Sequence, residues 1–409
     1  MTHGGVPRRV LPVLVVAQFA GTSLWFATNA VMPELQAELG WPASTAARLT
    51  SLLQLGFILG TLCFAVLAVA DRYPPRRVFL ACSLAGSLFT WAAWWWTDDL
   101  AVLMVLRVAS GFCLAGIYPV GMKIASQWYR QGLGHALGLL LAALILGSAA
   151  PHALRGLVAL GADVEWRIVF PLIALLVALG GVLQFLALPD PPKPVGAARA
   201  QPFDWRALGT LWTDRKVRAS VFGYFGHMWE LYAVWVAVPL LLAERLEGSA
   251  VSIVAFAVLG SGAVSCAWGG HLSRRWGSAR VGSTMLAISG LCCLITPWAV
   301  HAGDVLFYGW LMVWGLTVSS DSPQFSALTA SNAPAQAVGS VLTLTNCLGF
   351  SISILSIEAM SALLQLAELS SLLPFLAIGP LLGLWMMRTL LEQESAVGAE
   401  QLSQRPDTR

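Results

Sequence analysis

Charged residues are scarce in this 409-residue sequence. Asp, Glu, Lys and Arg together make up 11% of the chain, whereas soluble globular proteins carry roughly 25%. Hydrophobic residues account for 57%, and the mean hydropathy is +0.72. This composition excludes a soluble enzyme and a nucleic-acid-binding protein, and it leaves too much apolar surface for a disordered chain. The sequence therefore predicts an integral membrane protein.

Two further deficits narrow the function. The chain lacks the Gly-x-x-x-x-Gly-Lys-Ser/Thr nucleotide-binding loop, so ATP is not expected to drive it. Its seven cysteines lie in apolar runs without ligand-type spacing, and its six histidines are scattered. We therefore expect no disulfide framework, no metal site and no cofactor. The same scatter disfavours a membrane enzyme, which would need a clustered nucleophile and base.

Apolar runs between polar or Pro/Gly-rich breaks predict twelve transmembrane helices. Each needs about 20 apolar residues, and strands are excluded because a lone lipid-exposed strand leaves its backbone unsatisfied. The predicted spans are 10–33, 45–70, 78–97, 100–127, 134–158, 166–188, 219–243, 249–270, 281–300, 304–327, 336–360 and 370–390. The expected fold class is therefore an all-α polytopic membrane protein.

A long polar stretch divides the predicted spans into six plus six. It covers 189–218, opens with several prolines and continues with charged residues. We interpret it as a cytoplasmic linker between an N-terminal six-helix bundle, 1–188, and a C-terminal six-helix bundle, 219–391. The remaining residues, 392–409, are polar and are expected to form a disordered cytoplasmic tail.

The two bundles are related in sequence. A shift of 204 residues places Pro119 on Pro323, and a shift of 206 places Pro33 on Pro239. Offsets this similar at separate sites indicate tandem duplication. Parallel pseudo-symmetric bundles are the architecture of alternating-access carriers, whose substrate site lies between the halves near the middle of the bilayer.

Lysine and arginine fix the expected orientation. With the N-terminus inside, eighteen of the 24 basic residues fall on inner segments and four on outer segments, which is a strong positive-inside bias. Both termini are therefore expected in the cytoplasm, with the protein in the plasma membrane, the inner membrane of a bacterium. The four outer cations are Arg48, Arg155, Arg167 and Arg245.

A few ionisable residues fall inside the predicted spans, where charge is costly and usually marks function. Glu230 lies near the middle of the seventh span, and His227 precedes it by three residues on the same helix face. An imidazole beside a carboxylate predicts a proton-loading pair. Asp321 lies in the tenth span, just before Pro323, where a carboxylate at a helix bend could bind a proton or a cation. A structural hydrogen bond or ion pair is the alternative for each group.

Arg107 in the fourth span cannot shed its charge, so it needs a carboxylate, a water-filled cavity or an anionic substrate. Glu230 and Asp321 are both open as its partner. Polar and aromatic residues of the first and seventh spans are candidates for the cavity lining, with packing or interfacial positions as the alternative. These candidates are Gln18, Trp25, Asn29, Tyr224, Trp229 and Tyr232.

The loop after the second span reads Asp-Arg-Tyr-Pro-Pro-Arg-Arg at 71–77. It resembles the Gly-x-x-x-Asp-Arg-x-Gly-Arg-Arg/Lys motif of the major facilitator superfamily, with Leu67 and Pro74 in place of the two glycines. Arg107 and Gly111 match the Arg-x-x-x-Gly pattern of the family's fourth helix. The resemblance covers essentially the whole chain and implies twelve helices in two bundles that rock about a central site. It also favours a coupling or gating role for Arg107.

The eleventh helix is expected to begin on the cytoplasmic side, so its partially positive N-terminus faces inward. Asp71 can dock there and latch the two halves together while the outside is open. Arg72, Arg76 and Arg77 are expected to belong partly to this latch, and a topology signal is the alternative for them.

Together these patterns predict a secondary active carrier of a small organic solute, coupled to protons, and Arg107 favours an anionic solute. Proton-driven efflux of hydrophobic drugs or toxic compounds is the main alternative, and a non-transporting membrane sensor is a remote one. The expected partners are the solute, protons and the lipid bilayer. No nucleic acid is expected to bind, and the protein is expected to be a monomer.

Overall fold

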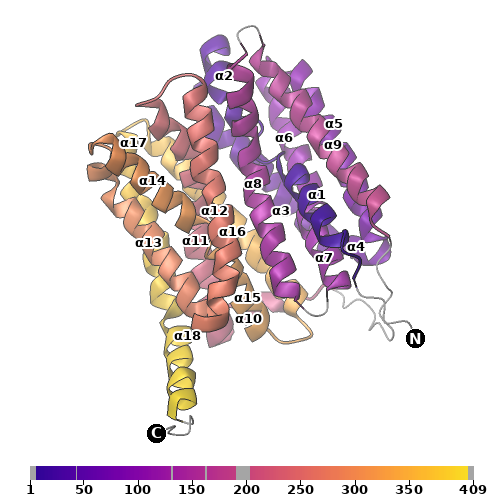
Figure 1. Ribbon diagram of the computed structural model, residues 1–409, viewed down its shortest axis with the longest axis vertical. Helices are drawn as coiled ribbons and strands as arrows, with labels where there is room; N and C mark the ends of the chain where they lie inside the picture. The colour runs from indigo at the N-terminus through magenta and orange to yellow at the C-terminus, as the bar shows by residue number, and fades with distance from the viewer. Residues whose placement is uncertain (1–5, 43, 130–131, 162–163, 190–202, 404–409) are drawn as a thin grey trace.

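The structure is a computed structural model that describes residues 6–42, 44–129, 132–161, 164–189 and 203–403 (Figure 1). These residues form helices and connecting turns without a strand. The α-helices and short 3₁₀ helices (η) are α1 (Val10–Thr22), η1 (Asn29–Val31), α2 (Met32–Leu39), α3 (Ser44–Val66), α4 (Val69–Arg72), α5 (Pro75–Trp95), α6 (Leu100–Leu114), α7 (Tyr118–Trp128), α8 (Leu133–Ala159), η2 (Trp166–Ile168), α9 (Val169–Ala187), α10 (Ala207–Thr213), α11 (Arg215–Ala243), α12 (Ser249–Trp276), α13 (Ser278–Ala299), α14 (Asp304–Val318), α15 (Ser322–Asn332), α16 (Val338–Leu363), α17 (Leu369–Leu372), η3 (Leu373–Ala377) and α18 (Ile378–Ser403). The predicted all-α class is confirmed.

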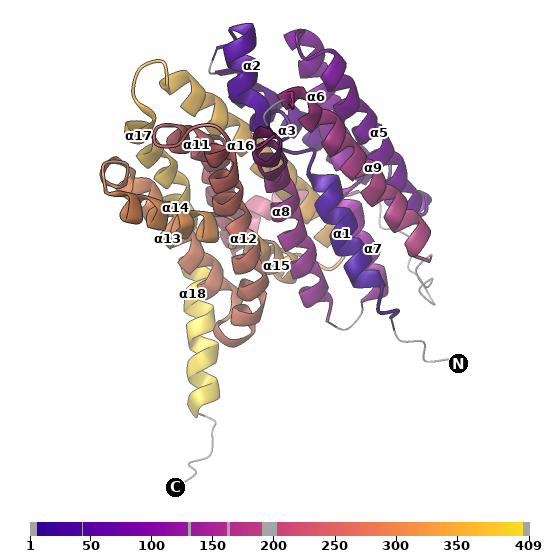
Figure 2. The same ribbon diagram turned by 45° about the horizontal axis from the view of Figure 1, so that its top comes forward.

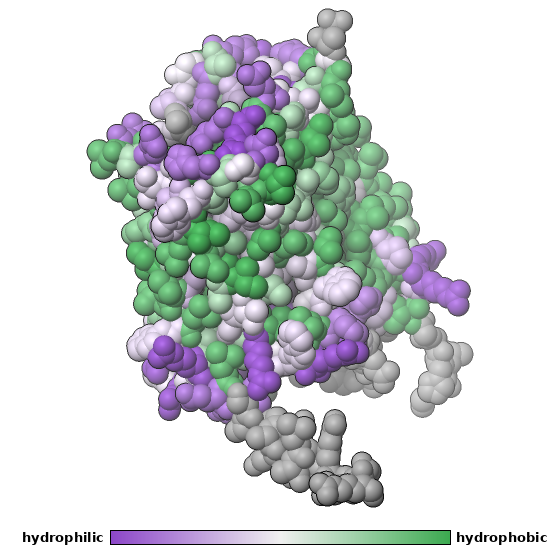
Figure 3. All heavy atoms as spheres, turned by 60° about the vertical axis from the view of Figure 1, so that its left-hand side comes forward, coloured by the Kyte–Doolittle hydropathy of each residue, from purple (hydrophilic) through white to green (hydrophobic). Residues whose placement is uncertain are grey.

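Ten helical segments of the described chain are long and apolar enough to cross a membrane. The first and tenth predicted spans are crossed by interrupted helices instead. α1 ends at Thr22 and leads through turns to η1, and three residues separate the end of α14 from the start of α15. With these two, the chain has the twelve membrane-crossing segments predicted. Figure 3 shows the corresponding apolar belt between two polar ends of the molecule.

The two halves stand side by side, with α1 to α9 in one and α11 to α18 in the other (Figures 1 and 2). The start of α1 and the end of α18 lie at the same end of the molecule. The halves meet where α8 packs against α12 and where α3 packs against α16. Any site shared by the halves must therefore lie between these two contacts.

The duplication inferred from the sequence extends through the fourth and tenth spans. A shift of 204 residues takes α6 onto α14 and α7 onto α15, residue for residue. Both spans are therefore interrupted at the same place, after fifteen helical residues. In each half the second segment carries proline within its first turn, where the missing amide hydrogen is tolerated.

Glycines allow the interrupted spans to cross their neighbours closely. A Cβ added to Gly111 of α6 would lie 1.9 Å from the Leu53 carbonyl oxygen of α3. A Cβ added to Gly315, its counterpart in α14, would lie 2.1 Å from the Val258 carbonyl oxygen of α12. Close backbone contact through glycine is a common way for membrane helices to pack without hydrophobic driving force.

The predicted linker and tail differ in how much of them the structure describes. Residues 190–202 of the linker lie outside the described residues. The rest includes α10, which packs against α11 and α16, and the Asp204 amide donates to Ser340 Oγ at 3.0 Å. The tail was expected to be disordered from about Glu392, but α18 continues to Ser403. The helix continues because this part of the tail, including Glu392, Ala396 and Ala399, is rich in residues with high helix propensity.

Candidate functional site

Arg107 of α6 reaches the interrupted part of the first span. The residues from Ser23 to Thr28 form turns, so some of their carbonyl oxygens lack the amide that a continuous helix would supply. The Arg107 guanidinium donates to the carbonyl oxygen of Leu24 at 3.0 Å and to that of Trp25 at 2.5 Å. Only 3% of Arg107 is exposed. In this conformation the buried cation is therefore held by backbone carbonyls of its own half, and the two carboxylates left open as its partners bind elsewhere.

His227 of α11 lies against Asp321 at the break between α14 and α15. Its Nδ1 atom is 2.7 Å from Asp321 Oδ1, and neither side chain is exposed. The sequence paired His227 with Glu230, but residues three apart on a helix point about 60° away from each other. The imidazole consequently faces α15, while Glu230 faces another helix. The proline signal did locate the break, because Pro323 is in the first turn of α15.

Glu230 occupies a separate polar pocket against α13. Ser289 donates its hydroxyl to Oε1, and the Cys293 thiol donates to Oε2 at 3.3 Å. Glu230 is fully buried. Ser289 and Cys293 are four residues apart on α13, so both face the same side of that helix. Neither residue carries a sequence signal that distinguishes it from an ordinary small residue of an apolar helix.

Aromatic side chains from both halves meet above these groups. Trp25 stacks on Tyr232 with ring centroids 5.5 Å apart and 12° between the planes. The ring centroid of Phe350, in α16, lies 5.5 Å from that of Trp25 and 4.8 Å from that of Phe57, in α3. Trp25 and Tyr232, both predicted to line the cavity, thus contact each other across the boundary between the halves. All four rings are buried, so this aromatic cluster closes the centre of the molecule.

The other four cavity candidates have different surroundings. Gln18 lies over Gly121 of α7, and Asn29 donates to Thr50 Oγ1 at 2.9 Å, both within the N-terminal half. The Tyr224 hydroxyl bonds to Asn346 Oδ1 at 3.0 Å. Trp229 packs instead against helix η3 and α18, with its ring 5.5 Å from that of Phe375. It faces away from the boundary between the halves, because it is on the α18 side of α11.

Sequence comparison agrees with this architecture. A family profile described as Major Facilitator Superfamily matches residues 14–357. The chain belongs to the major facilitator superfamily. It is therefore an integral membrane protein of a transporter family, and the fold resemblance inferred from the loop motif and the duplication is confirmed.

Two curated proteins similar to this chain have names that refer to transport or drug resistance. A protein of Streptomyces coelicolor, named as a probable transporter, is 27% identical over 344 residues, which cover 82% of this chain and 77% of the relative. A chloramphenicol resistance protein of Streptomyces lividans is 30% identical over 221 residues, which cover 53% of this chain and 54% of that protein. The second match thus spans about half of each chain.

The superfamily loop motif is arranged differently from the expected latch. Asp71 forms an ion pair with Lys123 of α7, in its own half, rather than with α16. Arg76 donates to the carbonyl oxygens of Phe185, at 3.3 Å, and Leu188. Arg76 therefore caps the end of α9. Cations at a helix C-terminus are favourable because they meet its partial negative charge. Arg72 and Arg77 are exposed at the same end of the molecule.

Three of the four outer arginines pair with acidic residues, and no pattern in the sequence predicts these pairs. Arg155 pairs with Glu34, and Arg245 lies 2.8 Å from Asp304. Arg167 pairs with three carboxylates at 2.9 to 3.0 Å, those of Glu38, Asp98 and Glu165. These cations are thus locally neutralised, which explains how they are tolerated on the face that the positive-inside rule leaves poor in basic residues.

At the end of the molecule that is predicted to face outward, a small cleft, called the outer cleft below, separates α3 from α11 and α16. Its volume is about 40 Å³, and its lining includes Ala46, Ala237 and Met360. Such a space holds a few water molecules but no organic solute. Among the described residues, no group of three or more His, Cys, Asp or Glu side chains is arranged to hold a metal ion.

Proposed function

We propose that this superfamily member is a proton-coupled secondary transporter of a small organic solute. The N-terminal bundle, 1–188, and the C-terminal bundle, 219–391, would rock about the aromatic cluster and expose it alternately to either side. The observation that carries the proposal is the burial of His227, Asp321 and Glu230 in the C-terminal half. Isolated charges inside a membrane protein cost several kcal/mol, so such groups persist mainly where they have a function.

Both polar sites can hold a proton without rearranging the helices. A hydroxyl group donates or accepts, so the Ser289–Glu230 bond can reverse when the carboxyl group gains a proton. The 2.7 Å contact between His227 Nδ1 and Asp321 Oδ1 is close enough for a proton to reside on either atom. Because Asp321 lies at the break in its span, a change in its charge acts where the helix is easiest to bend. This position supports coupling between proton binding and movement of α15.

The proposed latch fits the same cycle. The outer cleft is too small for a solute, and Asp71 is paired with Lys123. A latch between Asp71 and the start of α16 would be needed only when the outside is open. We therefore propose that the pair with Lys123 is the released state and that Asp71 exchanges this partner for the α16 N-terminus during the cycle.

Efflux of hydrophobic compounds is the second candidate. It is favoured by the stacked rings of Trp25, Tyr232, Phe57 and Phe350, which offer apolar faces at the boundary between the halves. The relative named for chloramphenicol resistance points the same way. Arg107 favours an anionic or amphiphilic solute instead, provided that the solute displaces one of the two carbonyl oxygens bound to its guanidinium.

We further propose that the protein works as a monomer in the bacterial inner membrane, with both termini in the cytoplasm and without a catalytic activity of its own. The basic residues at one end and the neutralised arginines at the other support this orientation. A phosphatase reporter fused after Arg409 should be inactive, and a cytoplasmic reporter at the same position should be active. Strong phosphatase activity would contradict the orientation.

The coupling is tested in liposomes that contain the purified protein. A thermal-shift screen of organic acids, amphiphiles and chloramphenicol first selects the compound that stabilises the protein most. We expect an imposed pH gradient to drive accumulation of that compound by the wild type. Glu230→Gln should abolish this accumulation but retain exchange of labelled for unlabelled compound. Accumulation by Glu230→Gln at the wild-type rate would exclude this carboxylate from coupling.

A further inference from the structure

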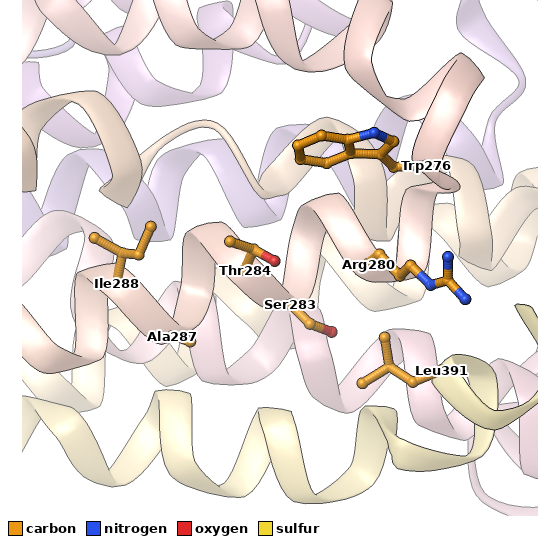
Figure 4. A pocket seen from close by; sticks show the side chains of 7 residues that line it. All are labelled: Trp276, Arg280, Ser283, Thr284, Ala287, Ile288 and Leu391. Carbon is orange, nitrogen blue, oxygen red and sulfur yellow. The ribbon is translucent and has the colours of Figure 1, made fainter. Parts of the chain in front are cut away.

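A groove of about 570 Å³ lies outside the transport site, between α13 and α18 and next to the end of α12. Trp276 covers one side, and Arg280 lies at one end (Figure 4). Ser283 and Leu391 face each other across it, and it follows α13 as far as Ile288. The groove is therefore polar at one end and apolar along its length.

The groove opens towards lipid rather than towards the boundary between the halves. On the same side of α13, Leu291 is 55% exposed and Leu294 is 41% exposed. On α18, Leu382 and Trp385 are each 56% exposed. In a chain that spans a membrane, exposed apolar side chains of this kind contact acyl chains. The groove thus continues into the lipid-facing belt.

The polar end of the groove lies at the level of a membrane interface. Trp276 is the last residue of α12, is 57% exposed and follows Arg274 and Arg275. Tryptophan and basic residues together are typical of the headgroup region at the cytoplasmic face. This is also the end of the molecule at which α1 begins and α18 ends.

One polar group in the groove lacks a partner. Ser283 is only 6% exposed, and its hydroxyl has no hydrogen-bond partner among the described residues. A buried hydroxyl without a partner is energetically unfavourable. Arg280 precedes Ser283 by about one helical turn, and both side chains line the groove. A ligand oxygen placed between them would satisfy the hydroxyl and meet a cation.

The backbone at the start of α13 is already occupied. Glu394 of α18 accepts hydrogen bonds from the amides of Ala279, at 2.8 Å, and Arg280, at 3.1 Å. An anion in the groove would therefore meet the side chains of Arg280 and Ser283 rather than the helix N-terminus. A guanidinium has five N–H donors in a planar fork, so it can bind a phosphate alongside another partner.

We propose that this groove binds one anionic phospholipid of the cytoplasmic leaflet. Its phosphate would accept hydrogen bonds from the Arg280 guanidinium and the Ser283 hydroxyl. One acyl chain would follow Ala287, Ile288 and Leu391, and the Trp276 indole would cover the glycerol region. The volume suits a headgroup with the first part of an acyl chain, since small-molecule sites usually enclose about 300–1,000 Å³. The bound lipid would join α12, α13 and α18 and stabilise the C-terminal half.

The test compares lipids on the purified full-length protein in mild detergent. We expect phosphatidylglycerol to raise the thermal unfolding temperature and to remain bound in native mass spectrometry. Phosphatidylcholine should have little effect, and inorganic phosphate should have none. Arg280→Gln should weaken phosphatidylglycerol binding about tenfold, the effect of losing one charge-assisted hydrogen bond of about 1.4 kcal/mol. Ala287→Trp, which fills the groove from an exposed position, should also reduce it.

Arg274→Gln is the matched control, because it removes an equal charge from the last turn of α12, outside the groove. It should bind phosphatidylglycerol as the wild type does. Equal loss in Arg274→Gln and Arg280→Gln would indicate nonspecific attraction to the basic end and overturn the proposal. Wild-type affinity in Arg280→Gln and Ala287→Trp, or equal protection by inorganic phosphate, would also overturn it. Transport is not part of this test, so its outcome is independent of the proposed coupling.

Discussion

The fourth and tenth spans have the same backbone but opposite buried charges. A shift of 204 residues superimposes their segment boundaries, their breaks and the glycines at their closest crossings. The same shift takes Arg107 onto Leu311 and Asp321 onto Ile117, and all four residues are buried. The N-terminal half thus keeps a permanent cation, and the C-terminal half keeps a carboxylate with a histidine beside it.

This difference separates what the two halves share from what each does. The helix breaks and the close helix crossings are properties of the duplicated backbone, so both halves have them. The buried charges, in contrast, differ between the halves. Arginine stays charged at any physiological pH, whereas histidine and carboxylates can exchange protons. This difference fits the proposed division, in which the C-terminal half would handle protons while Arg107 of the N-terminal half holds the first span through a fixed charge.

Replacing the carboxylate that distinguishes the halves should have the largest effect. Asp321→Asn removes the proton-accepting group but keeps a side chain of similar size beside His227. We expect accumulation driven by a pH gradient to fall to the level of liposomes without protein. Exchange of the solute should persist, because the fold and the aromatic cluster are unchanged. Uptake of labelled solute with and without the gradient measures both quantities.

Ser320→Ala provides the control for this substitution. Ser320 is equally buried and adjacent in sequence, but its hydroxyl donates only to the Thr317 carbonyl oxygen, at 3.1 Å. Transport by Ser320→Ala should remain close to that of the wild type. If both variants lose accumulation to the same degree, then the break itself is sensitive to any change and the charge difference between the halves does not explain coupling.

The shared glycines should show the next largest effect, and it should be similar in both halves. Gly111→Ala and Gly315→Ala each place a Cβ about 2 Å from a backbone carbonyl oxygen, which cannot rotate away. Overpacking of this kind costs about 1–3 kcal/mol. We expect each variant to lower the thermal unfolding temperature of the purified protein, by similar amounts.

Two other glycines give matched controls for this prediction. Gly138 and Gly339 lie in spanning helices, but nothing lies within 4 Å of a Cβ built on either residue. Gly138→Ala and Gly339→Ala should therefore leave stability unchanged or raise it slightly, because alanine favours the helix by up to about 1 kcal/mol. A marked loss of stability in these two variants would show that space at the crossing is not the cause.

Much of the fold followed from patterns that lipid imposes on the sequence. Apolar runs located the spans, basic residues predicted an orientation, Pro119 and Pro323 indicated the duplication, and Pro323 alone suggested a bend in its span. These signals are local in the sequence, so they can be recognised without knowing which residues each helix contacts. The breaks in the first and fourth spans were not predicted. The helical extent of the tail was missed because polarity alone suggested disorder after Glu392.

The candidate site was only partly predictable, since it depends on which way side chains point. Sequence selected the buried ionisable groups but paired His227 with its neighbour in the chain. The fold instead brings other segments against α11: Asp321, just before α15, contacts His227, and Ser289 of α13 donates to Glu230. Trp229 illustrates the same limit. It faces α18, whereas Tyr232, about 60° away around α11, faces the other half.

Glycine patterns in a single sequence likewise did not distinguish Gly147, which contacts α1 closely, from Gly138, which does not.

The smallest expected effect concerns the loops that differ between the halves, where Asp71 corresponds to Arg274 at a shift of 203 residues. Asp71 and Lys123 are 44% and 28% exposed, so their pair is worth about 1 kcal/mol or less. Asp71→Asn should weaken the proposed latch and favour the conformation with a closed outer cleft. Lys123→Gln should have the opposite effect, because it frees Asp71 to dock at α16.

A cysteine introduced at Ala46, in the outer cleft, should react more slowly with an impermeant maleimide in Asp71→Asn and faster in Lys123→Gln. Each shift should be about fivefold or less, which is the population change that 1 kcal/mol produces. Rates that move in the same direction in both variants would show that Asp71 does not alternate between these partners.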